Sequence, residues 1–144
     1  MSIFQDAILR FGRTIMSYAG DAVFLQAAVS AAANVIVADG DVAEEEIESA
    51  ISGIRANPIL EKSYDTLRVE QELYEAIARA KTRAGRLENL RHISAIAERP
   101  IEQRQDVFLI GADVADIDGI SAVEHKALDE IAAALQVDKS ALLR

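Results

Sequence analysis

An uncharged segment, residues 22–38, most constrains how this chain can fold. It contains no Asp, Glu, Lys or Arg, and its alanines, valines and other apolar residues leave almost no polar side on a helix. A helix that is apolar nearly all round is stable only when neighbours pack around it. The segment is near the length of a membrane span, but Gln26, Ser30, Asn34 and the many alanines favour a core helix. We therefore expect residues 22–38 to form the central helix of a helical protein.

A strongly acidic stretch follows this segment at once. Six of the ten residues 39–48 are acids, and residues 36–54 contain no base. A similar arrangement recurs near the C-terminus, where the mainly apolar segment 107–114 leads into the sequence Asp116-Ile117-Asp118-Gly119. Val42 and Glu46 are four residues apart, as are Ile120 and Glu124, and the two pairs are separated by 78 positions (120−42 and 124−46). We interpret this as a degenerate internal repeat.

Apolar residues recur at helical spacing along the rest of the chain, and no segment alternates with a period of two. With 144 residues, half of them hydrophobic, the chain is expected to form one helical domain spanning residues 1–144. The fold class predicted is all-α, a compact bundle of about seven helices. Their expected ranges are 3–18, 22–38, 43–56, 65–82, 86–98, 101–115 and 121–136, followed by a short turn from Asp138.

The charge distribution excludes some classes of function. The net charge is −9, and the negative charge is concentrated around the two acidic loops. Such a surface repels phosphate backbones, so nucleic-acid binding is not expected, whereas cations or basic proteins are attracted. The chain has no cysteine and its first twenty residues make a poor secretory signal. We expect a cytoplasmic protein without a membrane span.

The two acidic loops are candidate sites for a divalent cation. Asp39, Asp41 and Glu46 are spaced so that three carboxylates could meet, and Asp116, Asp118 and Glu124 repeat the arrangement. Hard cations such as Ca²⁺ need several oxygen ligands. Neither loop is an EF-hand, which needs the pattern Asp-x-Asp-x-Asp-Gly followed by five residues and a Glu; in the second loop only four residues separate Gly119 from Glu124.

A purely structural role is the competing interpretation of these acids. Ser121 and Glu124 form a capping-box pattern, which alone would explain Glu124, and acids are favoured in a first helical turn. The position matching Ser121 is Ala43, so Glu46 lacks half of such a box. Asp39 and Asp116 follow helix C-termini, where the helix dipole opposes negative charge. Cation binding and a solvated acidic cap both remain open at this point.

The motif Ala38-Asp39-Gly40-Asp41-Val42, with Glu46 four residues later, and its echo from Asp116 to Glu124 resemble the TerB-type tellurite-resistance family. A related helical domain occurs in the N-terminal region of some membrane-anchored J-domain co-chaperones. The resemblance covers about residues 24–137. It implies an all-α domain whose two acidic loops lie close in space and bind divalent cations. It also implies a role in tellurite and stress responses through membrane-associated complexes. The second loop departs from the first by one extra residue before Ile120.

Two functions are therefore expected as alternatives. The first is a tellurite-resistance or stress-response protein that binds a divalent cation, with calcium the expected ion and manganese or zinc the alternatives. The second is a metal-independent, co-chaperone-like adaptor whose acidic face docks a protein partner. No nucleophile–base constellation stands out in the sequence, so no enzyme activity is expected.

Overall fold

The computed structural model describes residues 21–117 and 119–144, and within them it contains helices and turns but no strands. The predicted all-α bundle is thereby confirmed for this part of the chain, while the helix predicted for residues 3–18 lies outside it. The described helices are α2 (Ala22–Val37), α3 (Glu44–Ala56), α4 (Pro58–Glu61), α5 (Thr66–Ala80), α6 (Arg83–Ser94), α7 (Ile101–Ala115), α8 (Ala122–Leu135) and α9 (Lys139–Leu142).

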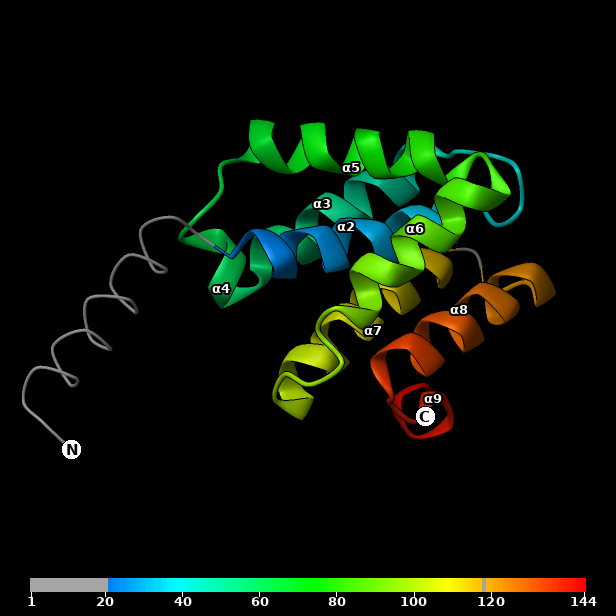
Figure 1. Ribbon diagram of the computed structural model, residues 1–144. Helices are drawn as coiled ribbons and strands as arrows, with labels where there is room; N and C mark the ends of the chain where they lie inside the picture. Colours follow the sequence, from blue (N-terminus) through cyan, green and yellow to red (C-terminus); the bar gives the residue numbers. More distant parts are fainter. Residues whose placement is uncertain (1–20, 118) are drawn as a thin grey trace, which may run out of the picture.

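Helix α2 lies at the centre of the bundle, as its composition predicts. Nearly every residue from Phe24 to Ile36 is buried, and α3, α5, α6, α7 and α8 all pack against the helix. In Figure 1, α5 lies above α2, and α7 and α8 lie below it. Asp21 starts the helix by accepting a hydrogen bond from the Phe24 N–H at 3.1 Å.

Helices α2 and α7 run parallel, and this decides where the acidic loops lie. At their N-terminal ends, Arg99 donates two hydrogen bonds to the Asp21 carboxylate. At their C-terminal ends, Asp39 borders the same cavity as Val114 and Ala115. The loops that follow α2 and α7 therefore leave the same end of the bundle. Helix α3 begins 78 residues before α8 (122−44), which is the offset of the interpreted sequence repeat.

Helices α5 and α6 cover α2 through a buried polar network. Asn89, fully buried in α6, donates to the Asn34 side chain at 3.0 Å and to the Ala76 carbonyl at 3.1 Å. Its carbonyl oxygen accepts from Arg79 at 2.8 Å and from Ser30 at 3.4 Å. This network occupies the part of α6 that faces α2, whereas the apolar side chain of Leu87 in the same helix is 56 % exposed.

Several helix boundaries differ from the sequence expectations, among them the end of α6, which lies at Ser94 and not at 98. Asn57 ends α3, but its side chain also accepts from the Ile59 N–H at 2.9 Å and so begins the single turn of α4, which was not predicted. Helix α6 begins at Arg83 and not at 86, because the Thr82 side chain caps it through the Gly85 N–H. No helix among the described residues is long and apolar enough to cross a membrane.

Candidate cation site between two acidic loops

Glu46 and Glu124 are both buried where the two acidic loops meet. Glu46 is 8 % exposed and Glu124 is 5 % exposed, which is unusual for carboxylates. They stand at equivalent positions, each the third residue of a helix that follows a loop, in α3 and α8 respectively. The N-terminus of a helix carries a partial positive charge that stabilises such acids.

Glu124 is fully accounted for as a helix cap. Its carboxylate accepts from the Ser121 N–H at 2.9 Å, and its own N–H donates to the Ser121 hydroxyl at 3.3 Å. This is the reciprocal capping box that the sequence predicted. A structural role therefore suffices to explain why an acid occupies position 124.

Glu46 has only one of the two hydrogen bonds of a capping box. Its carboxylate accepts from the Ala43 N–H at 3.3 Å, but Ala43 has no side-chain oxygen to return a hydrogen bond. Burial raises the pKa of Glu46 from 4.5 to about 7, the Ala43 hydrogen bond partly opposes this rise, and the negative charges of Asp39, Glu124 and Asp41 add to it. Near neutral pH this carboxyl group therefore holds a proton about half of the time.

A small cavity of about 80 Å³ separates the two loops. The polar side chains among its lining residues are all acids, namely Asp39, Glu45, Glu46 and Glu124, and apolar residues such as Val114 and Ile117 complete the wall. A buried water needs roughly 10–15 Å³, so the space holds several waters or a small hydrated ion. The structure thus brings one acid of the second loop next to three of the first.

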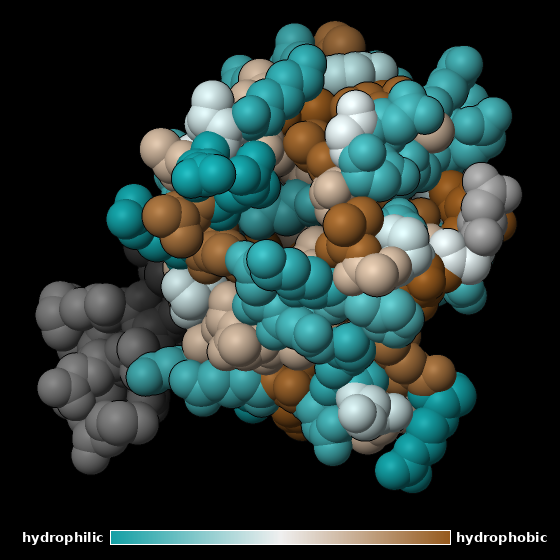
Figure 2. Space-filling view, turned by 90° about the vertical axis from the view of Figure 1, so that its right-hand side faces the viewer, coloured by the Kyte–Doolittle hydropathy of each residue, from teal (hydrophilic) through white to brown (hydrophobic). Residues whose placement is uncertain are grey.

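The other candidate residues are placed less centrally. Asp39 accepts from the Asp41 N–H at 3.0 Å, which forms a tight turn around Gly40 (φ 80°) and leaves Asp41 exposed beside the cavity lining. Asp116 is exposed at the C-terminal end of α7, and it does not line the cavity. Asp118 lies outside the described residues. The end of the molecule that carries the loops faces the viewer in Figure 2, where hydrophilic residues predominate.

The two loops have the same length, six residues each (38–43 and 116–121), but the glycine stands one position later in the second loop. Gly40 and Gly119 both have a positive φ, of 80° and 84°. Gly40 stands three residues before the capping residue of its helix, Ala43, whereas Gly119 stands two before Ser121. The two loops are therefore similar in position and composition but not superimposable residue by residue.

Within residues 21–117 and 119–144, no three His, Cys, Asp or Glu side chains are grouped closely enough to hold a metal ion. The cavity thus presents two buried carboxylates with acids at its edge, and not a completed ligand shell. Carbonyl oxygens and waters are regular ligands of Ca²⁺ and Mg²⁺, so side chains need not supply every bond.

The sequence interpretation overlooked Glu45, which lines the cavity beside Glu46. Glu45 lies in the first turn of α3, where acids are favoured, so nothing in the spacing singles it out. The only available signal was the run of three acids from 44 to 46, which exceeds what capping requires.

The chain was compared with protein-family models, with curated proteins and with solved structures, and none of the three comparisons finds a match. The fold and the loop geometry together define an all-α bundle with an acidic cavity at one end.

Proposed function

We propose that this protein is a TerB-like stress-response protein that binds one divalent cation between its two acidic loops. The observation that carries the proposal is Glu46, a buried acid with an incomplete cap and a pKa of about 7. A carboxylate that is destabilised by burial and by three neighbouring acids gains most from a bound cation, because the cation relieves both costs.

In this proposal the cation replaces the proton on Glu46 and neutralises Glu124 across the cavity. Asp39 contributes from the first loop, Asp41 and Asp116 contribute negative potential, and carbonyl oxygens and waters complete the shell. Calcium is the expected ion because every ligand is an oxygen, and manganese or zinc are alternatives. The protein acts in tellurite and stress tolerance by presenting the filled loops to a protein partner, in the cytoplasm and in a membrane-associated complex.

Thermal unfolding of protein from which metal has been removed with a chelator tests the proposal. Adding millimolar calcium should raise the midpoint, because a ligand that binds only the folded state stabilises it by mass action. Manganese and zinc are tested in the same way. The double variant Asp39→Asn, Glu46→Gln should have a higher midpoint than the wild type without metal, since the repulsion is gone, and should no longer respond to the cation.

Glu48→Gln is the matched control, because Glu48 is an exposed acid of α3 outside the cavity lining. It should respond to calcium as the wild type does. If none of the three ions moves the wild-type midpoint, cation binding is wrong. The metal-independent adaptor then becomes the better function, and its acidic face would be the docking surface.

A further inference from the structure

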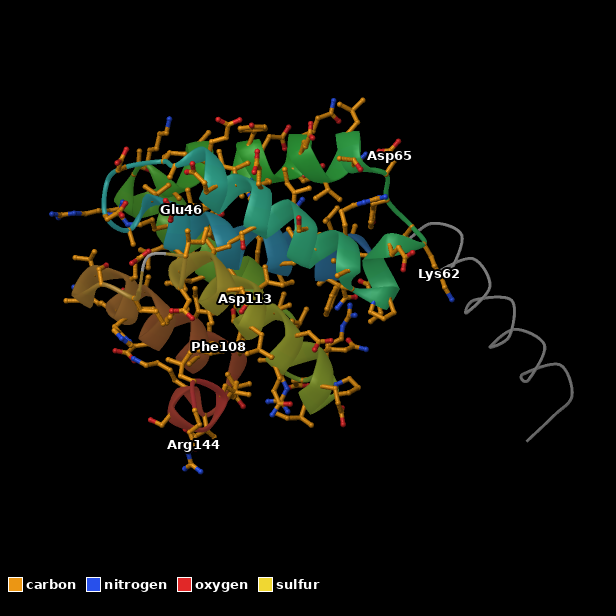
Figure 3. All side chains as sticks on the ribbon, turned by 180° about the vertical axis from the view of Figure 1, so that it is seen from behind. Glu46, Lys62, Asp65, Phe108, Asp113 and Arg144 are labelled. Carbon is orange, nitrogen blue, oxygen red and sulfur yellow. The ribbon has the colours of Figure 1, made fainter. Side chains whose placement is uncertain are left out.

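A pocket of about 320 Å³ lies where α2 ends and where α6 and α8 begin. Helices α6 and α8 face the viewer in Figure 1, whereas α3 and α7, with Glu46 and Asp113, are seen from behind in Figure 3. The volume is within the range of roughly 300–1,000 Å³ that is usual for small-molecule sites. At about 30 Å³ per water, the pocket has room for a ligand of about ten non-hydrogen atoms.

Two basic side chains, Arg86 and Lys126, line this pocket in a protein whose net charge is −9. Among residues 21–117 and 119–144, neither of them takes part in a salt bridge. Arg86 is fixed at two points, because its carbonyl accepts from the buried Asn34 side chain at 3.3 Å and its Nη1 donates to the Ala80 carbonyl at 3.1 Å. A guanidinium has several N–H donors, so this anchored side chain can still donate to a ligand, and its ordering costs less entropy on binding.

The other charges around the pocket favour a ligand with a single negative charge. Glu130 is the acid of the lining, and it reduces the excess of the two bases to about one positive charge. The N-terminal ends of α6 and α8 add partial positive charge, which the C-terminal end of α2 partly offsets. Lys126 and Glu130 are one helical turn apart on α8, but an exposed pair at this spacing is weak and does not compete with a bound ligand.

The rest of the wall is apolar. Val37, Ala38, Val123 and Ala127 contribute to it, and Val123 is 47 % exposed at the start of α8. Covering these side chains removes apolar surface from water, which favours a ligand with an apolar body. A carboxylate fits beside this wall because its two oxygens match the planar N–H groups of a guanidinium.

We propose that this pocket binds a small monocarboxylate with an apolar body, such as a medium-length fatty acid. The carboxylate accepts hydrogen bonds from Arg86 and Lys126, and the hydrocarbon chain lies against Val37, Val123 and Ala127. This inference does not depend on cation binding, because the pocket and the acidic cavity between the loops share no lining residue.

An NMR titration of the full ¹⁵N-enriched chain with hexanoate, in the absence of divalent metal, tests the proposal. Hexanoate should shift the amide signals of residues 37–38, 86 and 123–127 in a saturable way, with a dissociation constant in the millimolar range or below. Hexan-1-ol has the same hydrocarbon chain without the charge, and inorganic phosphate has negative charge without the chain. Each should bind at least about tenfold more weakly than hexanoate.

Substitutions in the pocket test the role of its charges. Arg86→Met and Lys126→Met should each weaken hexanoate binding by about tenfold, and Lys126 is exposed, so its substitution should not disturb the fold. Glu130→Gln should tighten binding by about two- to fivefold, because it removes a repulsive charge. Arg91→Met is the matched control, since it removes the same charge from an exposed position of α6 outside the lining, and it should leave the affinity unchanged.

Four results would overturn the proposal: no saturable shift with hexanoate, equally tight binding of hexan-1-ol or phosphate, an unchanged affinity in Lys126→Met, or weaker binding in Glu130→Gln. Because the titration is free of divalent metal, such a failure leaves the cation proposal standing. A missing response to calcium in thermal unfolding would equally leave the carboxylate pocket standing.

Discussion

At the scale of single residues, Glu46 shows how strongly its surroundings can change the acidity of a carboxyl group. Glu46 and Glu124 occupy equivalent places at the starts of α3 and α8, and both are buried. A serine completes the cap of Glu124, whereas an alanine leaves Glu46 with a single 3.3 Å hydrogen bond. Burial together with this incomplete cap and the neighbouring acids raises the pKa of Glu46 to about 7.

The stability of the protein should therefore depend on pH through Glu46. Its folded pKa of about 7 is above the ordinary 4.5, so the folded state binds the proton more tightly than the unfolded state. Stability is lost as pH rises from about 4.5 through 7, because ionising the buried carboxyl costs the folded state roughly 3 kcal/mol at about 1.4 kcal/mol per pKa unit. In the presence of a chelator, the wild type and Glu46→Gln should thus have similar unfolding free energies at pH 4.5. At pH 8 the variant should be more stable than the wild type by up to roughly 3 kcal/mol.

Urea unfolding of both proteins across this pH range measures the difference. Glu124→Gln is a useful comparison, because Glu124 is buried at the equivalent position of α8 and has the complete capping box that Glu46 lacks. A stability difference between wild type and Glu46→Gln that stays constant from pH 4.5 to pH 8 would contradict the assignment of a raised pKa to Glu46.

Asn89 gives a second prediction at the residue scale. Its amide joins α2, α5 and α6 through four hydrogen bonds, and the residue is fully buried. Asn89→Leu keeps a similar volume but leaves polar groups of Asn34, Arg79 and the Ala76 carbonyl without partners. Unsatisfied buried groups cost about 1–3 kcal/mol each, so three of them should lower the unfolding free energy by roughly 3 kcal/mol or more in a urea titration. Gln71→Leu, at an exposed position of α5, should change stability by less than about 0.5 kcal/mol.

At the scale of helices, the burial of α2 could be predicted from composition, and most helix ranges follow from apolar spacing. The features that the sequence did not predict depend on contacts between helices. Leu67, Tyr74 and Leu87 are large apolar residues of α5 and α6 that are exposed, whereas the polar residues Asn89 and Arg79 form a hydrogen bond between these two helices. The turn of α4 was missed because one residue, Asn57, both ends a helix and begins another. Neither effect can be recognised from the spacing of apolar residues along the sequence.

The glycines of α6 and α3 provide a prediction at this scale. A Cβ at Gly85 would lie 1.7 Å from the Arg79 carbonyl oxygen, so Gly85 is what allows α6 to start directly against the end of α5. A Cβ at Gly53 would meet Ile110 at 3.5 Å, an ordinary contact. Gly85→Ala should lower the unfolding free energy by about 2 kcal/mol or more, because the backbone must move. Gly53→Ala should raise it by roughly 0.5–1 kcal/mol, because alanine is the better helix former. Opposite signs in thermal unfolding are the expected result, and a neutral Gly85→Ala would show that α6 can shift freely.

At the scale of the whole molecule, the candidate site exists because α2 and α7 run parallel. Their parallel packing brings Asp39, Glu46 and Glu124 around one cavity although up to 85 residues separate them in sequence (124−39). The sequence could suggest the six acids through their repeated spacing. It could not distinguish Asp39, which lines the cavity, from Asp41 and Asp116, which do not, because that depends on how each loop turns at its glycine.

The ion pair between Asp21 and Arg99 should hold these two parallel helices in place. It joins the N-terminal ends of α2 and α7 with two hydrogen bonds, and both side chains are largely buried, at 19 % and 26 % exposure. Asp21→Asn keeps an oxygen to cap α2 but loses the charge, and Arg99→Met removes the partner. A double-mutant cycle of these substitutions should give a coupling energy of about 1–2 kcal/mol at pH 7.

The pH dependence of this coupling is a stricter test. Arg99 lowers the pKa of Asp21 below 3.8, so the coupling is fully present above pH 3.8 and is lost as pH falls through the lower folded value. The control is the pair between Lys139 and Asp129, which joins neighbouring helices near the C-terminus and leaves Asp129 64 % exposed. Its coupling should stay below about 1 kcal/mol, as for other exposed pairs. Equal coupling energies for the two pairs would mean that the parallel packing of α2 and α7 rests on their apolar contacts alone, since Asp21 and Arg99 would then add no more than a surface pair.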